Sequence, residues 1–256
     1  MNYYLFGQMI KRDFRQRYKG SILGILWSVI IPIVMLAIYT FVFGEIFQAK
    51  WSQDSDNKFE YAFIIFCGLC VVNMVTEVMN RSTMAILGNV NYVKKVVFPL
   101  EILPVSMTIT AVANASISFT ILIIGSSIFL NQFYIVSLEV FLLLIPLVVM
   151  NMGVAFFLSA ITVYYRDMLN LVGIMSTIIL YISPVFYSVE GVPAMFKNFI
   201  YINPLTLIIE NARNVCLEGT HINALEFGIM MVMSSLILFL GYWIFNRLKK
   251  GFADVM

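Results

Sequence analysis

Few side chains in this sequence have types and spacings that could do chemistry. Cys67 and Cys70 form a C-x-x-C pair, a spacing used by redox centres and zinc sites. The pair lies inside the apolar run Tyr61–Thr76, and no third or fourth ligand is near it in sequence. We therefore expect two packing residues one helical turn apart. His221 is the single histidine, and we interpret it as an ordinary loop residue rather than a catalytic one.

Three acidic residues, Glu77, Glu139 and Glu226, fall at the ends of long apolar runs. A charge inside a membrane is a candidate for ion or proton coupling. A carboxylate at the end of a span reaches water, so we expect solvation here instead. The sequence contains no G-x-x-x-x-G-K-[ST] phosphate loop, no H-E-x-x-H and no G-x-S-x-G. We therefore expect no ATPase site and no hydrolase site in this chain.

The composition indicates that these residues belong to a membrane protein. Residues of the set AVILMFWYC make up 61% of the 256 residues, and charged residues make up 12%. Soluble proteins have about 45–50% apolar residues, even with glycine counted, and about 25% charged ones. The mean hydropathy of +0.91 agrees. We predict an all-α integral membrane protein that forms one domain over residues 1–256.

Apolar runs of about 20 residues, enough to cross a bilayer, define the expected helices. We predict six transmembrane helices, at about 20–44, 59–79, 102–130, 138–165, 168–189 and 225–246. Gly20-x-x-x-Gly24 in the first span could allow close helix packing. The segment Asn198–Ile209 is too short to cross and is interrupted by Pro204. Residues 190–221 are therefore predicted to form an outer region with short re-entrant helices before the last span.

The basic residues predict the orientation. Six spans put both termini on one side, and that side receives twelve of the 16 Lys and Arg residues. The positive-inside rule then makes both termini cytoplasmic. We recognise no cleavable signal peptide, because the basic cluster follows the first apolar residues and no small-residue cleavage site appears.

Residues 1–19 are predicted to form a separate amphipathic helix in the cytoplasmic interface. Its aromatic and aliphatic residues recur every three or four positions, and its basic residues fill the other faces. The apolar positions are Tyr3, Phe6, Ile10, Phe14 and Tyr18. Two roles remain open for this helix: an anchor that sets topology, or a docking surface for a lipid headgroup or a partner subunit.

Four segments together resemble one known family. They are Arg17–Trp27 (RYKGSILGILW) followed by Pro32, Asn91–Pro104 (NYVKKVVFPLEILP), Tyr164–Asp167 (YYRD), and Ser183–Tyr187 (SPVFY) followed by Asn203–Leu205 (NPL). These segments resemble the permease subunits of type-2 ABC exporters, and more narrowly the Wzm-like polysaccharide branch. One departure is that Cys67–Asn73 (CGLCVVN) stands where many members have a Pro-Trp pair, which leaves the substrate subclass open.

The resemblance implies a homodimer of six-helix subunits in the bacterial inner membrane, paired with two copies of a separate ATPase subunit. ATP and magnesium would bind to that subunit, so we expect no cofactor in this chain, no enzymatic activity of its own and no nucleic-acid partner. The implied cargo is a polysaccharide carried on a polyprenyl pyrophosphate or related membrane lipid. O-antigen of lipopolysaccharide is our first choice, and capsular polysaccharide and teichoic acid are the near alternatives.

Two other classes of protein fit less well. A membrane-embedded transferase for lipid-linked substrates would need clustered Asp, Glu or His at a membrane face. An ion-coupled carrier would need intramembrane charges that this chain mostly lacks.

Four groups of site residues follow as predictions. Because the chain has no phosphate loop, we expect a separate ATPase to drive it through a contact on the cytoplasmic side. We assign that contact to Arg81, Lys94, Lys95, Phe98 and Pro99. A pyrophosphate needs a cationic receptor at headgroup depth, which we assign to Lys11, Arg12, Arg15 and Arg17.

The conduit for the saccharide is expected to be lined by aromatic side chains, along which a sugar polymer can slide. We assign this lining to Trp27, Tyr39, Tyr181 and Tyr187. Pro204 belongs to the implied outer gate. Membrane anchoring is the alternative role for the basic and aromatic residues.

Overall fold

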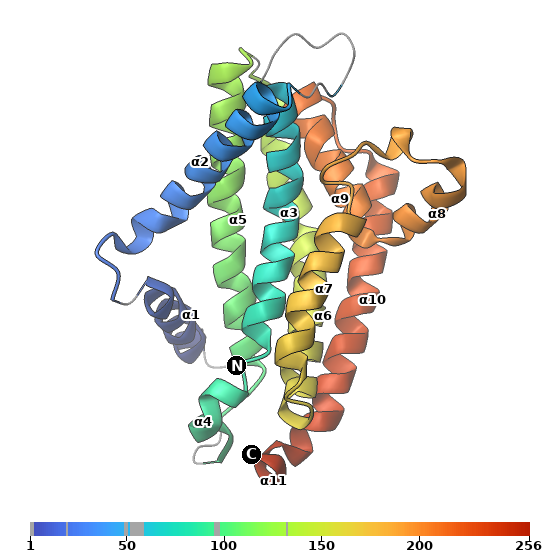
Figure 1. Ribbon diagram of the computed structural model, residues 1–256. Helices are drawn as coiled ribbons and strands as arrows, with labels where there is room; N and C mark the ends of the chain where they lie inside the picture. The colour runs from blue at the N-terminus through green and yellow to red at the C-terminus, as the bar shows by residue number, and fades with distance from the viewer. Residues whose placement is uncertain (1–2, 19, 49–50, 52–58, 95–97, 132) are drawn as a thin grey trace.

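Long apolar helices run side by side and make up most of this molecule (Figure 1). The computed structural model describes residues 3–18, 20–48, 51, 59–94, 98–131 and 133–256. Every regular element within these residues is helical, which confirms the predicted all-α class. The longest helices are α3 (Glu60–Ser82), α5 (Ile102–Phe129), α6 (Val140–Tyr164) and α10 (Ala224–Leu248).

Among the residues that the structure describes, five helical stretches are long and apolar enough to cross a membrane. They are Gly24–Ile46, Glu60–Ser82, Ile102–Phe129, Ile135–Tyr164 and Ala224–Val255. The sixth expected span contains α7 (Met168–Ile182), which has only 15 residues. This helix ends where Ser183 turns to an extended conformation, because the residue before a proline disfavours the helical region. The count of six spans therefore stays a prediction.

The first span begins later than expected. It consists of η1 (Gly24–Leu26), α2 (Trp27–Tyr39) and η2 (Thr40–Ile46). Gly20 and Gly24 have φ angles of +87° and +51°, and no atom of another segment would lie within 4 Å of a side chain at either position. Within the described part of this chain, neither glycine makes the close helix contact that their spacing suggested. The two glycines allow the left-handed turns by which the chain leaves the N-terminal helix and enters the span.

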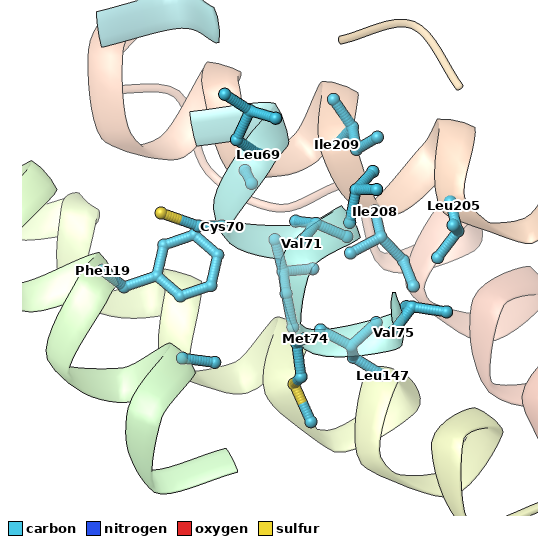
Figure 2. Close-up of a cluster of buried hydrophobic side chains, with 14 of the residues drawn as sticks. Leu69, Cys70, Val71, Met74, Val75, Phe119, Leu147, Leu205, Ile208 and Ile209 are labelled. Carbon is cyan, nitrogen blue, oxygen red and sulfur yellow. The ribbon is translucent and has the colours of Figure 1, made fainter. Parts of the chain in front are cut away.

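The core forms around the first half of α3, which is apolar on all sides and is therefore buried by its neighbours. Its residues from Ala62 to Val72 are buried without exception. Figure 2 shows side chains of α3 meeting Phe119 of α5, Leu147 of α6, and Leu205 and Ile208 of α9 (Pro204–Arg213). Cys70 lies in this cluster, and Cys67 is also buried in it. Both cysteines thus pack in the core.

The helices α6 and α10 cross at two glycines. A Cβ atom on Gly241 would lie 2.0 Å from the carbonyl oxygen of Gly153, and one on Gly153 would lie 2.5 Å from the carbonyl oxygen of Ile237. Only glycine allows two backbones to approach this closely. The crossing fixes the last span against the bundle.

The two ends of the bundle differ. One end holds α1 (Tyr3–Tyr18), η3 (Leu87–Asn89), α4 (Val90–Lys94), η7 (Lys249–Gly251) and α11 (Phe252–Val255), and both chain termini lie toward it (Figure 1). The other end holds η4 (Ile135–Glu139), η5 (Val189–Gly191), α8 (Ala194–Ile202), α9 and η6 (Asn214–Glu218). Four of these short elements, η5, α8, α9 and η6, lie between Val189 and Glu218, where short helices were predicted before the last span.

The N-terminal helix α1 docks on the bundle through one buried face. Met9 and Asp13 are buried, one turn apart. Asp13 accepts a hydrogen bond from the hydroxyl of Ser106 near the start of α5. The helix is therefore attached to the protein as well as amphipathic, and its basic residues point in different directions.

Candidate functional site

A cavity of about 350 Å³ lies between α2, α3 and α5, close to the end of α1. Three residues that we predicted as site residues line it: Arg17 from α1, and Trp27 and Tyr39 from the first span. The structure thus brings together one proposed pyrophosphate contact and two proposed conduit aromatics. The other polar residues of the wall are Ser28, Asn73, Glu77, Asn114 and Ser118.

One oxygen of Glu77 is the centre of a polar cluster on this wall. Its Oε1 accepts hydrogen bonds from the guanidinium of Arg17, from Arg81 Nη1 at 3.1 Å and from Asn114 Nδ2 at 3.4 Å. Arg81 Nη1 also donates to the hydroxyl of Thr110 at 2.7 Å. The cluster therefore joins α1, α3 and α5.

Helical spacing explains why these residues meet. Glu77 and Arg81 are four residues apart on α3, and Thr110 and Asn114 are four residues apart on α5. Residues at this spacing share one face of a helix. Since α3 and α5 pack along their length, the two polar faces meet at one level of the bundle.

The other basic residues of α1 lie apart from the cavity. Arg12 forms an ion pair with Asp13 at 3.0 Å, and it reaches Asn89 Oδ1 at 3.2 Å and the Tyr92 hydroxyl at 3.4 Å. Lys11 and Arg15 are exposed. The four residues predicted to hold a pyrophosphate therefore divide into two places: Arg17 faces the cavity, whereas Lys11, Arg12 and Arg15 line a second pocket of about 310 Å³ along α1.

The residues predicted to contact an ATPase also divide. Lys94, at the end of α4, and Pro99 are exposed. The ring of Phe98 lies 4.5 Å from that of Tyr92. Arg81, by contrast, belongs to the Glu77 cluster and donates to the Glu77 carboxylate beside the cavity. Lys95 lies outside the described residues.

The two remaining aromatic candidates lie near the end of α7, away from the cavity. Tyr181 is exposed, and its ring lies 6.0 Å from that of Phe186. The hydroxyl of Tyr187 donates to the carbonyl oxygen of Ile182 at 2.6 Å. Trp27 and Tyr39 are thus separated from Tyr181 and Tyr187 within one chain.

Comparison with known proteins decides the family. Residues 4–217 match the model of the ABC-2 type transporter family. The chain belongs to this family. The resemblance seen in the four sequence segments is confirmed, and the chain is the membrane permease of its transporter rather than the ATPase.

Curated relatives match the permease over nearly its whole length. It is 25% identical to an O-antigen export system permease protein RfbA of Klebsiella pneumoniae over 99% of this chain and 96% of the relative. It is 22% identical to the protein of the same name from Myxococcus xanthus over 96% and 93% of the two chains. It is 20% identical to the polysialic acid transport protein KpsM of Escherichia coli over 94% and 92%.

At the other end of the permease, Pro204 is the first residue of α9. The side chain of Asn203 caps this helix by accepting from the backbone N–H of Leu205 at 3.0 Å, and it donates to Ser183 Oγ at 3.0 Å. Proline suits this first position because its missing N–H would have no helical partner there. Pro204 also lines an apolar cavity of about 450 Å³ between α3, α6, α7, α9 and α10.

Sequence reasoning missed the role of Arg213, which it counted among the outer charges. The side chain is buried, and its guanidinium donates to the carbonyl oxygen of Val185 at 2.8 Å and to Glu210 Oε1 at 3.1 Å. It also stacks over Trp51 at 4.9 Å. Burial raises the pKa of Glu210, and the charge of Arg213 partly opposes that rise. The available sequence signal was an arginine one turn after a glutamate on the apolar helix α9.

The three acidic residues singled out in the sequence all bind protein groups. Glu77 is described above. Glu139 accepts from the backbone N–H of Ile222 at 3.1 Å and lies 2.6 Å from His221 Nδ1. Glu226 accepts from Asn211 Nδ2 at 2.6 Å. Each of these carboxylates is partly exposed and also binds protein groups, so each joins two helical segments or a helix and a loop.

Proposed function

We propose that this permease exports a polysaccharide, with O-antigen of lipopolysaccharide as the cargo. The observation that supports this most strongly is the match to O-antigen export permeases over nearly the full length of both chains. A match of that extent includes both ends of the bundle and not only a shared core. The permease acts as a homodimer with two separate ATPase subunits, and that complex hydrolyses ATP.

The cargo is carried on a polyprenyl pyrophosphate. Two features of the cavity favour a saccharide on such a lipid. Arg17 offers a guanidinium near the N-terminal interface helix, and a guanidinium binds phosphate oxygens through two parallel N–H donors. Trp27 and Tyr39 line the same space, and their ring faces suit the C–H surfaces of a sugar. We propose that the lipid-linked end of the polymer enters here.

The two ends of the bundle have opposite roles in this proposal. Both termini and the exposed Lys94 lie at one end, which we place in the cytoplasm against the ATPase. Pro204, Tyr181 and Tyr187 belong to the other end, which we place outside as the gate and the exit of the conduit. The excess of basic residues on the first side supports this orientation.

Capsular polysaccharide is the second candidate. The match to the polysialic acid transport protein KpsM, over 94% of this chain, favours it. The mechanism would be the same with a different polymer.

Deletion of the gene in its own bacterium tests the proposal and separates the two polymers. We expect the surface polysaccharide to disappear, while lipid-linked polymer accumulates inside and becomes detectable only after the cells are permeabilised. Loss of the lipopolysaccharide ladder with an intact lipid A–core band identifies O-antigen, and loss of capsule alone identifies the second candidate. Unchanged surface polysaccharides of both kinds would contradict the proposal. A plasmid copy of the gene should restore the lost polymer.

A further inference from the structure

The cluster around Glu77 is built like an anion-binding site that already contains an anion. Two guanidinium groups and one amide, from three different helices, donate to a single carboxylate oxygen. A phosphate oxygen is recognised by the same groups, arginine N–H and amide N–H donors. The carboxylate of Glu77 therefore occupies the place that a phosphate oxygen would take.

The charges of the cluster leave room for a second anion. The three charged side chains Arg17, Glu77 and Arg81 together carry a net positive charge. The side chains of Arg17, Glu77 and Arg81 are 30%, 19% and 26% exposed. Arg17 and Glu77 are thus partly withdrawn from solvent and line the cavity together with Asn114. Arg81 lies behind them and contacts Glu77 at 3.1 Å.

We infer that Arg17, Arg81 and Asn114 form a phosphate-binding site for the pyrophosphate of the lipid-linked cargo, and that Glu77 is an internal competitor for it. This inference rests on the proposed function and adds two donors and a competitor to it. Arriving pyrophosphate takes over the donors of Glu77. The hydrogen bonds to Glu77 are thereby replaced by hydrogen bonds to the cargo. The strength of the Glu77 contacts then determines how tightly the permease binds the pyrophosphate.

The replacement also has a structural consequence. In the unoccupied cluster, Glu77 ties the end of α1 to α3 through Arg17. Arg81 lies one residue before the end of α3, which leads into the segment with η3 and α4. Cargo binding therefore acts on the helix that connects the cavity to the proposed ATPase contact.

A purely structural ion cluster would respond to mutation with the opposite sign. If Glu77 only neutralises two arginines, removing its charge disorders them and weakens anion binding. If Glu77 competes with the cargo, the same change frees the donors and strengthens binding. The sign of the change in affinity after Glu77→Gln thus distinguishes the two roles.

The experiment measures lipid binding to the permease–ATPase complex in nanodiscs of phosphatidylcholine. The probe is a fluorescent short-chain polyprenyl pyrophosphate, and the corresponding polyprenol is the uncharged comparison. We expect Glu77→Gln to tighten pyrophosphate binding about fivefold, and Arg17→Gln or Arg81→Gln to weaken it about tenfold. Binding of the polyprenol should not change. Weaker or unchanged binding by a folded Glu77→Gln variant would overturn the inference.

Matched controls come from the exposed turn between α6 and α7. Asp167→Asn and Arg166→Gln make the same charge changes at exposed positions outside the cavity, and both should bind the probe like the wild type. If the controls changed the affinity for the probe as much as the cluster variants do, the effect would come from overall charge alone. That result would overturn the inference. Asn114→Ala leaves both ion pairs in place and should weaken binding about threefold, which keeps a test available if Glu77→Gln does not fold.

Competition with inorganic pyrophosphate shows whether the site binds a membrane lipid or free pyrophosphate. Because the cavity lies next to spans, we expect a membrane-borne ligand, so free pyrophosphate should compete at least tenfold more weakly than the lipid probe. Equal competition would overturn the lipid-borne part of the inference. The binding assay needs no export. Gene deletion could therefore abolish surface polymer while Glu77→Gln leaves the affinity for the lipid probe unchanged. That pair of results would contradict the inference and leave the proposed function standing.

Discussion

At the residue scale, buried polar side chains connect elements that the hydrophobic core alone would leave free to slide. Asp13 binds Ser106 and thereby holds α1 to α5. Arg213 binds the carbonyl oxygens of Val185 and, more weakly, Ile64, and thereby holds α9 to the loop after α7 and to α3. A buried polar group is costly unless it is paired, so these contacts define which segments belong together.

The first prediction concerns Arg213. In Arg213→Met, the carbonyl oxygen of Val185 loses its donor and the half-buried Glu210 loses its ion pair. We expect a destabilisation of about 2–3 kcal/mol, measured by thermal unfolding of the permease in detergent. Lys197→Met on α8 also removes one positive charge at a partly exposed position, and it should unfold like the wild type. Equal stability of the two variants would show that the buried contacts of Arg213 do not matter.

At the element scale, backbone geometry limits the position of the last span. The crossing of α6 and α10 at Gly153 and Gly241 has no space for a methyl group. Substitution of either glycine therefore has to separate the helices or bend them.

The second prediction compares two glycines of the same helix. Gly241→Ala places a Cβ atom against the Gly153 carbonyl oxygen, whereas no neighbouring atom lies within 4 Å of a Cβ on Gly228. We expect Gly241→Ala to lose about 1–3 kcal/mol of stability through overpacking. Gly228→Ala should be neutral or gain up to about 1 kcal/mol, because alanine favours helix more than glycine does. Thermal unfolding and yield of folded protein measure both, and equal behaviour would argue against the close crossing.

The third prediction concerns the segment between α3 and α5 as the ATPase contact. The double variant Lys94→Glu and Lys95→Glu reverses its charge, so the complex with the ATPase should weaken about tenfold. Co-purification of the ATPase with tagged permease measures this. Lys250→Glu, an exposed change at the same end of the bundle, is the control and should retain its partner. If the double variant retained the ATPase fully, the contact would have to lie in another part of the permease.

Apolar length and charge in the sequence predicted most of the elements. The spans that became α3, α5, α6 and α10 were predicted because each contains a long run without charge, which a bilayer requires. The start of the first span was misplaced, because composition does not show that Gly20 and Gly24 adopt left-handed angles. The shortness of α7 follows from Ser183-Pro184, a signal that was present in the sequence but outweighed by the uncharged run around it.

The site was less predictable because it depends on contacts between distant residues. Helical spacing showed that α1 is amphipathic, yet it could not show that Arg12 turns to Asp13 and Tyr92 while Arg17 turns to Glu77. The meeting of Arg17, Arg81 and Asn114 needs three helices to be placed in space. The role of Arg213 likewise depends on a carbonyl group 28 residues away in sequence.

At the scale of the whole molecule, the fourth prediction tests orientation. Both termini are predicted to be cytoplasmic, with the segment around Asp56 outside and the segment around Val90 inside. The native thiols of Cys67, Cys70 and Cys216 are buried, so the unsubstituted chain provides a low background for labelling. A membrane-impermeant maleimide added to intact cells should label Asp56→Cys and not Val90→Cys. Labelling of both, or of Val90→Cys alone, would reject the topology.

The central claim is that this permease, driven by a separate ATPase, moves a lipid-linked saccharide across the membrane. The most direct test uses proteoliposomes that contain the permease, its ATPase and a fluorescent polyprenyl-pyrophosphate oligosaccharide. External ATP drives only the copies whose ATPase faces outward, so we predict that the labelled sugar becomes protected from an external glycosidase. Protection should require ATP and both proteins. ATP hydrolysis by the complex with no gain in protected sugar would contradict the account.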